Sequence, residues 1–423
     1  MSPPESAEPI ELVVDSLAAG GDAVGRAGDG RVVFLPYAAP GERVRARLIE
    51  ERRQYARAEL VEVLSPAPER TEPPCPLFRD RSCGGCAWQH LVYPAQVRAK
   101  QAIAASALRR ALARGLELQP IDARVEPYGW RRRARLHWVR PPSSPAALIG
   151  LYAPRSHQVT GVDSCPQLEP ALERALEPLN RVLAPGLFQR GEIDLLASPR
   201  GEVQVAVRGP CRRGAAEVLV GQGSVVGVIL GRMAFGAGAL EIEPGQWAQA
   251  DRFAQASRAG NQALLEAVDR AARPRDGARV LELHAGSGNL TRVLAAGAAR
   301  VLAVDARPGR PSGEPHVEWR VGSVEEVAGE LAAAGERFDL VVLDPPREGA
   351  RPLCQSIAAL EPRRVVYVSC DPATLARDLD QLDALGYAAR WALPIDLMPQ
   401  TAHVELVVAI ERAGPGDGSI EEE

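Results

Sequence analysis

The chain has 423 residues, 46% of them hydrophobic, with a formal net charge of −4 and seven cysteines. This length predicts about two or three domains with sizeable cores. No run of about 18 apolar residues is present, which argues against a membrane-spanning helix, and the first residues lack the pattern of a signal peptide. We therefore expect a cytoplasmic protein whose cysteines are ligands, catalysts or core residues rather than disulfides.

Short strand candidates separated by glycine-rich turns fill the first sixty residues. The candidates are residues 10–14, 31–35, 42–49 and 57–63. Several short strands at this spacing predict a small β-barrel. A proline-rich connector then begins at Ser65-Pro66 and predicts an extended linker.

Three cysteines follow the connector in the spacing C-x7-C-x2-C, and Gly84-Gly85 separates the last two. Closely spaced thiols with glycine-permitted turns are typical of metal or iron–sulfur sites. Four thiolates would fit either tetrahedral zinc or an iron–sulfur cluster, and the spacing does not separate the two. The three cysteines are Cys75, Cys83 and Cys86; Cys165 is the obvious fourth ligand, with His90, His157 and Cys211 as other candidates.

A basic region comes next. Residues 98–140 hold eleven basic and three acidic side chains, a net charge of +8, and an amphipathic helix is expected over 91–114. An alternating pattern predicts a strand through Arg135–Val139. Basic side chains near Tyr128 and Trp130 suit an RNA groove with phosphate contacts and base stacking. A solvated, charged edge strand is the alternative.

A strand, glycine loop, helix, strand and acid then follow in the order of a nucleotide-binding half-domain. After a helical segment expected over 245–273, residues 279–283 predict a strand, His284–Leu290 the loop, and Asp305 the acid after the next strand. The loop reads E-x-x-x-G-x-G, without the third glycine of the dinucleotide pattern, which favours S-adenosylmethionine over NAD. A further strand over 338–343 ends in Asp344-Pro345-Pro346, a methyltransferase feature.

One cysteine, Cys370, stands directly after an apolar, β-branched strand candidate at Val365–Val368 and just before a helical pattern. Open α/β sheets bind their ligands at the carboxyl ends of strands. A helix N-terminus lowers the pKa of a thiol, so a reactive thiolate is one hypothesis. A buried, apolar core cysteine is the other.

Four motifs give the chain a resemblance to the uracil-5 RNA methyltransferases, and the barrel resembles a TRAM domain. The resemblance implies an α/β fold, with a Rossmann-like class I methyltransferase domain after an N-terminal TRAM-like β-barrel and a central α+β domain. We expect the barrel over 1–66, the central domain over 67–244, the catalytic domain over 245–413 and a disordered acidic tail over 414–423. The motifs are LELHAGSGNL (281–290), LDPPREG (343–349), VYVSCDPATLARD (366–378) and DLMPQTAHVE (396–405).

The resemblance also implies roles for individual residues. Cys370 matches the nucleophile that adds to carbon 6 of uracil, which makes carbon 5 able to attack a sulfonium methyl group. Glu405 matches the base that removes the carbon-5 proton. Cys75, Cys83, Cys86 and Cys165 match ligands of a 4Fe–4S cluster. The S-adenosylmethionine site would comprise Gln249, His284, Gly286, Gly288, Asn289, Asp305, Ser323 and Asp344, although His284 stands where Phe or Tyr is usual and Ser323 where Asn or Asp is expected.

RNA is the partner that the resemblance implies, and 23S ribosomal RNA is favoured because the barrel and the cluster accompany that branch. Uridine 54 of transfer RNA is an alternative substrate for the same chemistry. A catalytically silent RNA-binding assembly factor is an alternative of another class, disfavoured by intact Cys370 and Glu405. We expect a monomer without membrane association, and RNA contacts from the barrel residues Arg31, Arg52, Arg53 and Arg57.

Overall fold

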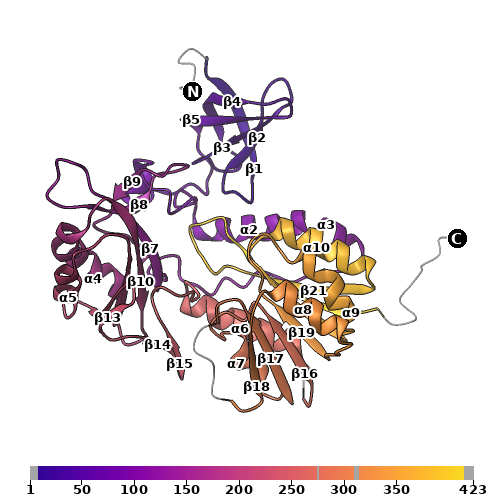
Figure 1. The fold of residues 1–423 in the computed structure, drawn as a ribbon. Helices are drawn as coiled ribbons and strands as arrows, with labels where there is room; N and C mark the ends of the chain where they lie inside the picture. Colours follow the sequence, from indigo (N-terminus) through magenta and orange to yellow (C-terminus); the bar gives the residue numbers. More distant parts are fainter. Residues whose placement is uncertain (1–7, 274–275, 309–313, 414–423) are drawn as a thin grey trace. The chain divides into compact units, whose positions relative to one another are not determined.

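The structure, a computed structural model, describes residues 8–273, 276–308 and 314–413 (Figure 1). The expected tail at 414–423 lies outside these ranges. Contacts divide the chain into two units: the first holds the residues up to Ile103, Val125–Gly238 and Met398–His403, and the second holds the rest. Within the described ranges, no helix combines the length and apolar character needed to cross a membrane.

A closed five-stranded barrel begins the first unit and confirms the predicted fold of this segment, with strand order β1-β2-β3-β5-β4. Alternate residues such as Leu12, Val14 and Val33 form its core. The sequence pattern did not predict β2, which lies in a glycine-rich stretch. A Cβ at Gly25 in this strand would stand 2.5 Å from the Leu12 side chain, so the packing requires glycine. The strands are β1 (Ile10–Leu17), β2 (Ala23–Arg26), β3 (Val32–Leu35), β4 (Arg43–Glu51) and β5 (Tyr55–Ser65).

Three of the four barrel arginines expected to contact RNA are paired with carboxylates of the same barrel. Arg31 is 2.6 Å from Asp29, Arg57 is 3.2 Å from Asp22, and Arg52 pairs with a neighbouring glutamate. The pairs of Arg31 and Arg52 are exposed and contribute little free energy, so these two guanidinium groups can exchange a carboxylate for a phosphate, whereas the Arg57 pair is partly buried. Their role in RNA binding stays a prediction.

A seven-stranded mixed sheet forms the centre of the first unit, in the order β13-β12-β11-β10-β7-β8-β9. One face packs on the buried side chains of α4, such as Leu172 and Leu176, through Leu136 and Trp138. The strands are β7 (Arg133–Val139), β8 (Leu148–Tyr152), β9 (Val159–Gly161), β10 (Arg190–Ala197), β11 (Val203–Arg208), β12 (Val225–Leu230) and β13 (Met233–Gly236). The helices of this segment are α1 (Pro76–Arg79), α2 (Tyr93–Ala107), α4 (Pro170–Pro178) and α5 (Arg213–Leu219), with short helical turns at Leu179–Leu183 and Ala184–Gly186.

The basic segment before β7 corrects two expectations. Strand β7 forms as predicted, but it lies between β10 and β8 and is therefore not an edge strand. Trp130 is buried, and its indole N–H donates to Gln167 Oε1 at 2.7 Å. The expected stacking of Trp130 on RNA bases is therefore wrong, because the ring is part of the packed interior.

An eight-stranded sheet forms the second unit, in the order β18-β17-β16-β19-β20-β22-β21-β6. The strands from β18 to β20 are mutually parallel, and β22 is antiparallel to both neighbours. This is the predicted Rossmann-like class I architecture. Its strands are β6 (Glu117–Leu118), β16 (Arg279–Leu283), β17 (Arg300–Asp305), β18 (Val317–Val321), β19 (Leu340–Leu343), β20 (Arg364–Ser369), β21 (Tyr387–Ile395) and β22 (Glu405–Arg412). A separate hairpin pairs β14 (Leu240–Glu243) with β15 (Gln246–Ala248).

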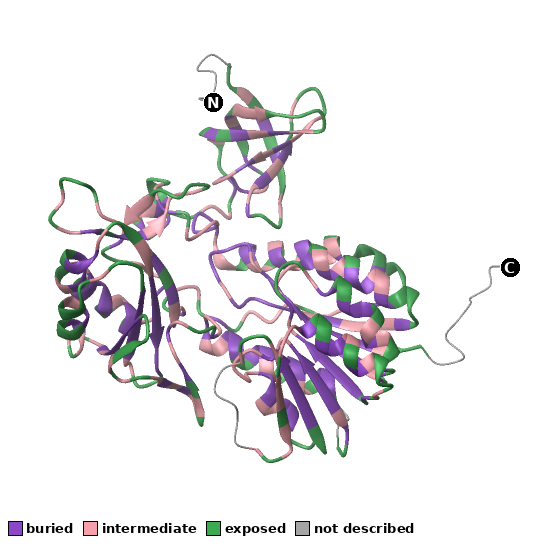
Figure 2. Cartoon of the chain, viewed as in Figure 1, coloured by how far each residue is buried: buried purple, intermediate pink, exposed green. Residues whose placement is uncertain are grey.

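Helices cover both faces of this sheet, whose central strands are mostly buried while the outer helix surfaces are exposed (Figure 2). One group shares a core with the sheet, and α6 packs against β20, β21 and β22 separately. The first group comprises α3 (Arg109–Ala113), α8 (Val324–Ala333), α9 (Cys354–Ala359) and α10 (Pro372–Ala384), with a 3₁₀ turn at Arg351–Leu353; α6 (Arg258–Ala272) contacts α7 (Thr291–Ala295).

The helical segment expected over 245–273 begins later than predicted. Helix α6 starts at Arg258 because Ser257 is its N-cap, whose hydroxyl accepts from the Gly260 N–H at 3.1 Å. The residues before it form β15 and a loop instead.

Candidate active site

Cys370 and Glu405 face each other across two neighbouring antiparallel strands. Strand β20 ends at Ser369, which pairs with Leu406 near the start of β22. In an antiparallel pair the next residue of one strand lies opposite the preceding residue of the other, so Cys370 comes opposite Glu405. The thiol is half-buried, and the Glu405 side chain is buried. Two residues 35 positions apart in the sequence are therefore neighbours at the carboxyl edge of the parallel strands.

Asp344 joins this pair from the neighbouring strand. It directly follows β19, whose last residue, Leu343, pairs with Tyr367 of β20. Burial raises the pKa of Asp344 to about 7. Burial and then the charge of Asp344 raise the pKa of Glu405 well above its ordinary value, while the nearby Arg347 guanidinium opposes that rise. The two carboxyl groups therefore hold protons more tightly than free carboxylic acids do.

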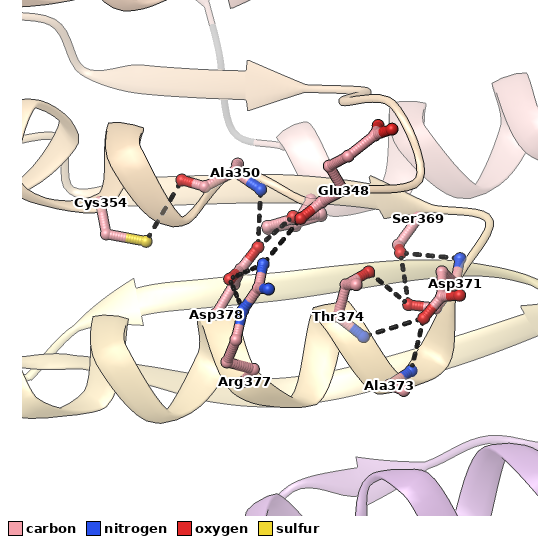
Figure 3. A network of polar contacts seen from close by, with 10 residues as sticks. Glu348, Ala350, Cys354, Ser369, Asp371, Ala373, Thr374, Arg377 and Asp378 are labelled. Carbon is pink, nitrogen blue, oxygen red and sulfur yellow. Dashed lines mark hydrogen bonds and ion pairs between the residues drawn. The ribbon is translucent and has the colours of Figure 1, made fainter.

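The thiol of Cys370 is not activated by the helix that follows it. Burial, and then the charge of Glu405, raise its pKa to about 11, with Arg347 acting in the opposite direction. The expected lowering by the N-terminus of α10 is wrong for a structural reason. The Asp371 carboxylate caps that helix and accepts from the N–H groups of Ala373 at 3.0 Å and Thr374 at 2.9 Å (Figure 3). The thiol is consequently protonated at neutral pH, and an attack through sulfur requires a base.

The glycine loop after β16 is held by the acid that follows β17. The Gly286 N–H donates to Asp305 Oδ2 at 2.8 Å. Gly286 and Gly288 have φ values of 56° and 81°, which favour glycine, and a Cβ at Gly286 would meet open space. His284 also has a positive φ, of 62°, and burial lowers its pKa. The loop thus leaves room for a ligand beside a neutral imidazole and a carboxylate.

The other expected donor-site residues have individual surroundings. Asn289 exchanges two hydrogen bonds with the buried Asn261 of α6, at 2.7 and 3.1 Å, and so ties the loop to that helix. Ser323 is the N-cap of α8 and accepts from the Glu326 N–H at 3.3 Å. Gln249 is half-buried in the loop after β15. The roles of Gln249 and Ser323 in donor binding stay predictions.

Glu282 and Thr291 are buried side by side below the loop, and hydrogen bonds from Thr291 oppose the rise that burial causes in the pKa of Glu282, which is about 8. The indole N–H of Trp319, whose ring would lie 3.3 Å from a Cβ at Gly288, has no hydrogen-bond partner within the described ranges. Buried polar atoms are normally satisfied, so a ligand with an acceptor atom is expected beside Trp319. Glu282 was not among the site residues predicted from the sequence, although it is the acid of the E-x-x-x-G-x-G pattern.

The four expected cluster ligands line one cavity in the first unit. Cys75, Cys83, Cys86 and Cys165 are all free thiols around it. Burial raises the pKa of Cys86 to about 12, and Arg131 opposes that rise. Within the described residues, no three His, Cys, Asp or Glu side chains are grouped so that they could hold a metal ion. The ligand set therefore stays a prediction.

Comparison with known proteins identifies the family. A TRAM domain model matches residues 8–61, and a model described as tRNA (uracil-5-)-methyltransferase matches residues 331–413. A 23S rRNA (uracil(1939)-C(5))-methyltransferase of Edwardsiella ictaluri is 33% identical and covers 91% of this chain and 92% of its own length. The chain belongs to the uracil-5 RNA methyltransferase family. A second enzyme of that name, from Alkalilimnicola ehrlichii, is 32% identical and covers 96% of this chain and 97% of its own.

A solved structure supports the fold of this family member. The tRNA (uracil-54, C5)-methyltransferase of Pyrococcus abyssi, in complex with S-adenosyl-L-homocysteine, matches with a TM-score of 0.70 at 21% identity. The match covers 95% of this chain and 100% of that one. The protein is therefore an S-adenosylmethionine-dependent RNA uracil-5 methyltransferase by family and fold, as the sequence motifs predicted.

Proposed function

We propose that this methyltransferase transfers a methyl group to carbon 5 of one uridine in 23S ribosomal RNA, with Cys370 as nucleophile and Glu405 as base. The observation that carries the proposal is the opposition of Cys370 and Glu405 across β20 and β22. A nucleophile for carbon 6 and a base for carbon 5 must reach adjacent atoms of one ring. Neighbouring positions on paired strands meet that requirement.

The proposed reaction passes through a covalent bond between Cys370 and the uracil ring. The Cys370 sulfur forms a bond to carbon 6 of uracil, and the electron pair of the 5,6 double bond moves to give an enolate. Carbon 5 then takes the methyl group from the sulfonium donor, which leaves as a neutral thioether. Glu405 removes the proton from carbon 5, the 5,6 double bond re-forms, and the thiolate is expelled. Each product molecule thus needs one proton acceptor after methyl transfer.

The raised pKa of the thiol adds a step before addition. Cys370 must lose its proton to become nucleophilic. Asp344 and Glu405 lie at the same edge and hold protons with raised pKa values. When ionised, either carboxylate can accept the thiol proton, and Arg347 stabilises the negative charge of both Glu405 and the thiolate.

S-adenosylmethionine supplies an electrophilic methyl group when it is bound. We propose that the open space at Gly286 and the carboxylate of Asp305 receive its nucleoside part. The indole N–H of Trp319, buried beside Gly288 without a partner among the described residues, supports a ligand with a hydrogen-bond acceptor there. The other proposed donor-site residues are Gln249, His284, Gly288, Asn289, Ser323 and Asp344.

We also propose a 4Fe–4S cluster at the four-cysteine cavity. Gln89 Oε1, Arg131 Nε and Gln167 Nε2 line the same cavity and are buried without partners among the described residues. The two nitrogen donors suit an anionic group with acceptor atoms, and Arg131 favours ionised thiols. Anaerobic purification should give about four iron atoms per chain and a brown chromophore; stoichiometric zinc without iron would overturn the assignment.

The substrate proposal rests on the relatives that carry a 23S rRNA name at 32–33% identity over most of both chains. Transfer RNA uridine 54 is the second candidate, because the structural match acts on that substrate. A monomer acting on RNA in the cytoplasm is proposed with it. A catalytically silent assembly factor would bind the same RNA without forming a covalent bond to it.

Mass spectrometric mapping of 5-methyluridine in RNA from a deletion strain tests the substrate. Loss of one 5-methyluridine from 23S rRNA, restored by the wild-type gene and not by Cys370→Ala, is expected. Loss of 5-methyluridine from transfer RNA alone would show that transfer RNA, and not 23S rRNA, is the substrate. Unchanged 5-methyluridine in every RNA, with tight RNA binding by the purified protein, would favour the assembly factor.

A further inference from the structure

A buried carboxylate, Asp378, lies two turns along α10 from Cys370 and has no part in the steps above. It is fully buried. Its Oδ2 accepts from the Ala350 N–H at 2.6 Å (Figure 3). The same oxygen accepts from the Tyr367 hydroxyl at 2.8 Å. Its Oδ1 accepts from Arg377 Nε at 2.9 Å. The carboxylate therefore joins three separate segments: the loop after β19, the strand β20 and its own helix.

The loop from Pro345 to Ala350 packs directly on this group. Arg377 donates to the carbonyl oxygen of Glu348 at 2.8 Å, beside the Asp378 contact to Ala350 (Figure 3). Gly349 has a φ of 82°, and a Cβ there would stand 2.5 Å from Asp378 Oδ2 and 2.6 Å from Arg377. Only glycine allows this approach, so the end of the loop is held against α10 through three consecutive residues.

The two ends of this connection both belong to the active site. The loop starts directly after Asp344 and carries Arg347, whose charge acts on both Cys370 and Glu405. Helix α10 starts two residues after Cys370. Asp378 thus connects the segment that carries Asp344 and Arg347 to the helix that follows the thiol. A shift of the loop on α10 would move a carboxyl group and a cation relative to the sulfur.

We propose that Asp378, held by Tyr367 and paired with Arg377, is a positioning residue that fixes the Asp344–Arg347 segment relative to Cys370, a role that rests on the reaction proposed above. It touches neither substrate nor donor in this role. It acts by keeping the Arg347 charge close to the thiol and to Glu405. Loosening the loop should therefore change the pH at which the thiol becomes reactive, and not merely the stability of the fold.

Asp378→Asn tests the proposal because it keeps the size of the side chain and removes the charge that pairs with Arg377. Asp380→Asn is the matched control, since Asp380 lies on the same helix and pairs instead with Arg110 and Arg114. The ionisation midpoint of Cys370 is measured from the pH dependence of its labelling by iodoacetamide between pH 8 and 12, and covalent adduct formation with RNA containing 5-fluorouridine is measured at pH 8 with donor present. We expect Asp378→Asn to move the midpoint up by about one pH unit, which is about tenfold slower addition below the midpoint. The KM for S-adenosylmethionine should stay at the wild-type value, and Asp380→Asn should match the wild type throughout.

Further variants keep the test decisive if Asp378→Asn does not fold. Arg377→Gln changes a side chain that is 41% exposed, and it should raise the pH midpoint by a similar amount. Tyr367→Phe removes one donor and should give a smaller shift in the same direction. A purely structural role would lower the melting temperature of these variants and leave the pH midpoint unchanged, which would overturn the proposal. Absence of any adduct in the wild type would instead reject the covalent function itself.

Discussion

Replacing Glu405 by Gln separates two effects of this carboxyl group. The amide has nearly the same size and stays neutral at every pH. Without the base, carbon 5 keeps its proton after methyl transfer, and the bond to Cys370 cannot be eliminated. General bases contribute roughly 10²- to 10⁴-fold to rates, so turnover should fall by that factor. A methylated covalent adduct should accumulate on RNA that contains ordinary uridine.

The second effect of the substitution is on the thiol, whose addition to uracil should become faster although turnover becomes slower. The charge of Glu405 is the largest cause, after burial, of the raised pKa of Cys370. Removing that charge should increase the thiolate fraction about tenfold for each pKa unit recovered. The increase is confined to pH values at which wild-type Glu405 is ionised, because below that range both side chains are neutral. Addition should thus become faster than in the wild type only in that range, where Asp344 remains to accept the thiol proton.

RNA labelled with tritium at carbon 5 measures both effects. Adduct is counted after denaturing electrophoresis, and proton removal is counted as tritium released to water. Glu411→Gln is the control, since Glu411 lies on the same strand β22 and pairs with Arg364 and Arg390 away from the site. Tritium release by Glu405→Gln at the wild-type rate would refute Glu405 as the base. A folded Glu405→Gln protein that forms no adduct would refute the order of the steps.

The same substitution has a defined effect on stability. The folded-state pKa of Glu405 is raised, so the folded protein favours the neutral carboxyl. That contribution to stability is complete below the unfolded pKa of about 4.3 and is lost as pH rises through the folded pKa. Glu405→Gln should therefore melt at a higher temperature than the wild type at pH 9 and at a similar temperature at pH 4.5. A lower melting temperature at pH 9 would contradict the burial argument.

Three further predictions concern other residues. With a pKa of about 11, Cys370 is roughly 0.03% thiolate at pH 7.5, so iodoacetamide should label it on the order of 10²-fold more slowly than free cysteine, by mass spectrometry. Trp130→Phe leaves Gln167 unpaired and should cost about 1–3 kcal/mol in urea unfolding, with unchanged RNA affinity in a filter-binding assay. Gly25→Ala forces a Cβ to within 2.5 Å of Leu12 and should cost about 1–3 kcal/mol, seen as a lower melting temperature of the barrel.

The position of Cys370 could be predicted from its sequence, but its ionisation could not. An apolar strand followed by a helical pattern places the thiol at a sheet edge whatever the rest of the chain does. Its pKa is raised by Glu405, which lies 35 residues later in the sequence. The carboxylate of Asp371 accepts the hydrogen bonds of the N–H groups at the start of the helix, so these groups do not act on the thiol. A local pattern contains neither of these contacts.

Trp130 and β2 illustrate the same limit in the first unit. A tryptophan beside arginines has the composition of an RNA-binding surface, yet burial is decided by the partner Gln167, far along the chain. The glycine in β2, Gly25, makes this segment an unfavourable strand by composition. The closed barrel nevertheless requires glycine there, because a Cβ would collide with the Leu12 side chain. Apolar strands such as β19 and β20 were predictable because burial on both faces gives them a continuous hydrophobic pattern.

The protons held by Cys370, Asp344 and Glu405 show why Arg347, on the loop after β19, affects the reaction as well as the thiol itself. At rest, the Cys370 sulfur holds a proton, and Asp344 and Glu405 retain protons to higher pH than ordinary carboxyls. The proposed reaction must remove the thiol proton before addition and a carbon-5 proton after methyl transfer. Arg347 lowers the pKa of Cys370 and of Glu405 alike, so it increases the ionised fraction of both the nucleophile and the base at a given pH. The charge balance around the thiol therefore involves Arg347, and the hydrogen bond from Ala350 to the buried Asp378 connects the loop that carries this cation to the helix beside the thiol.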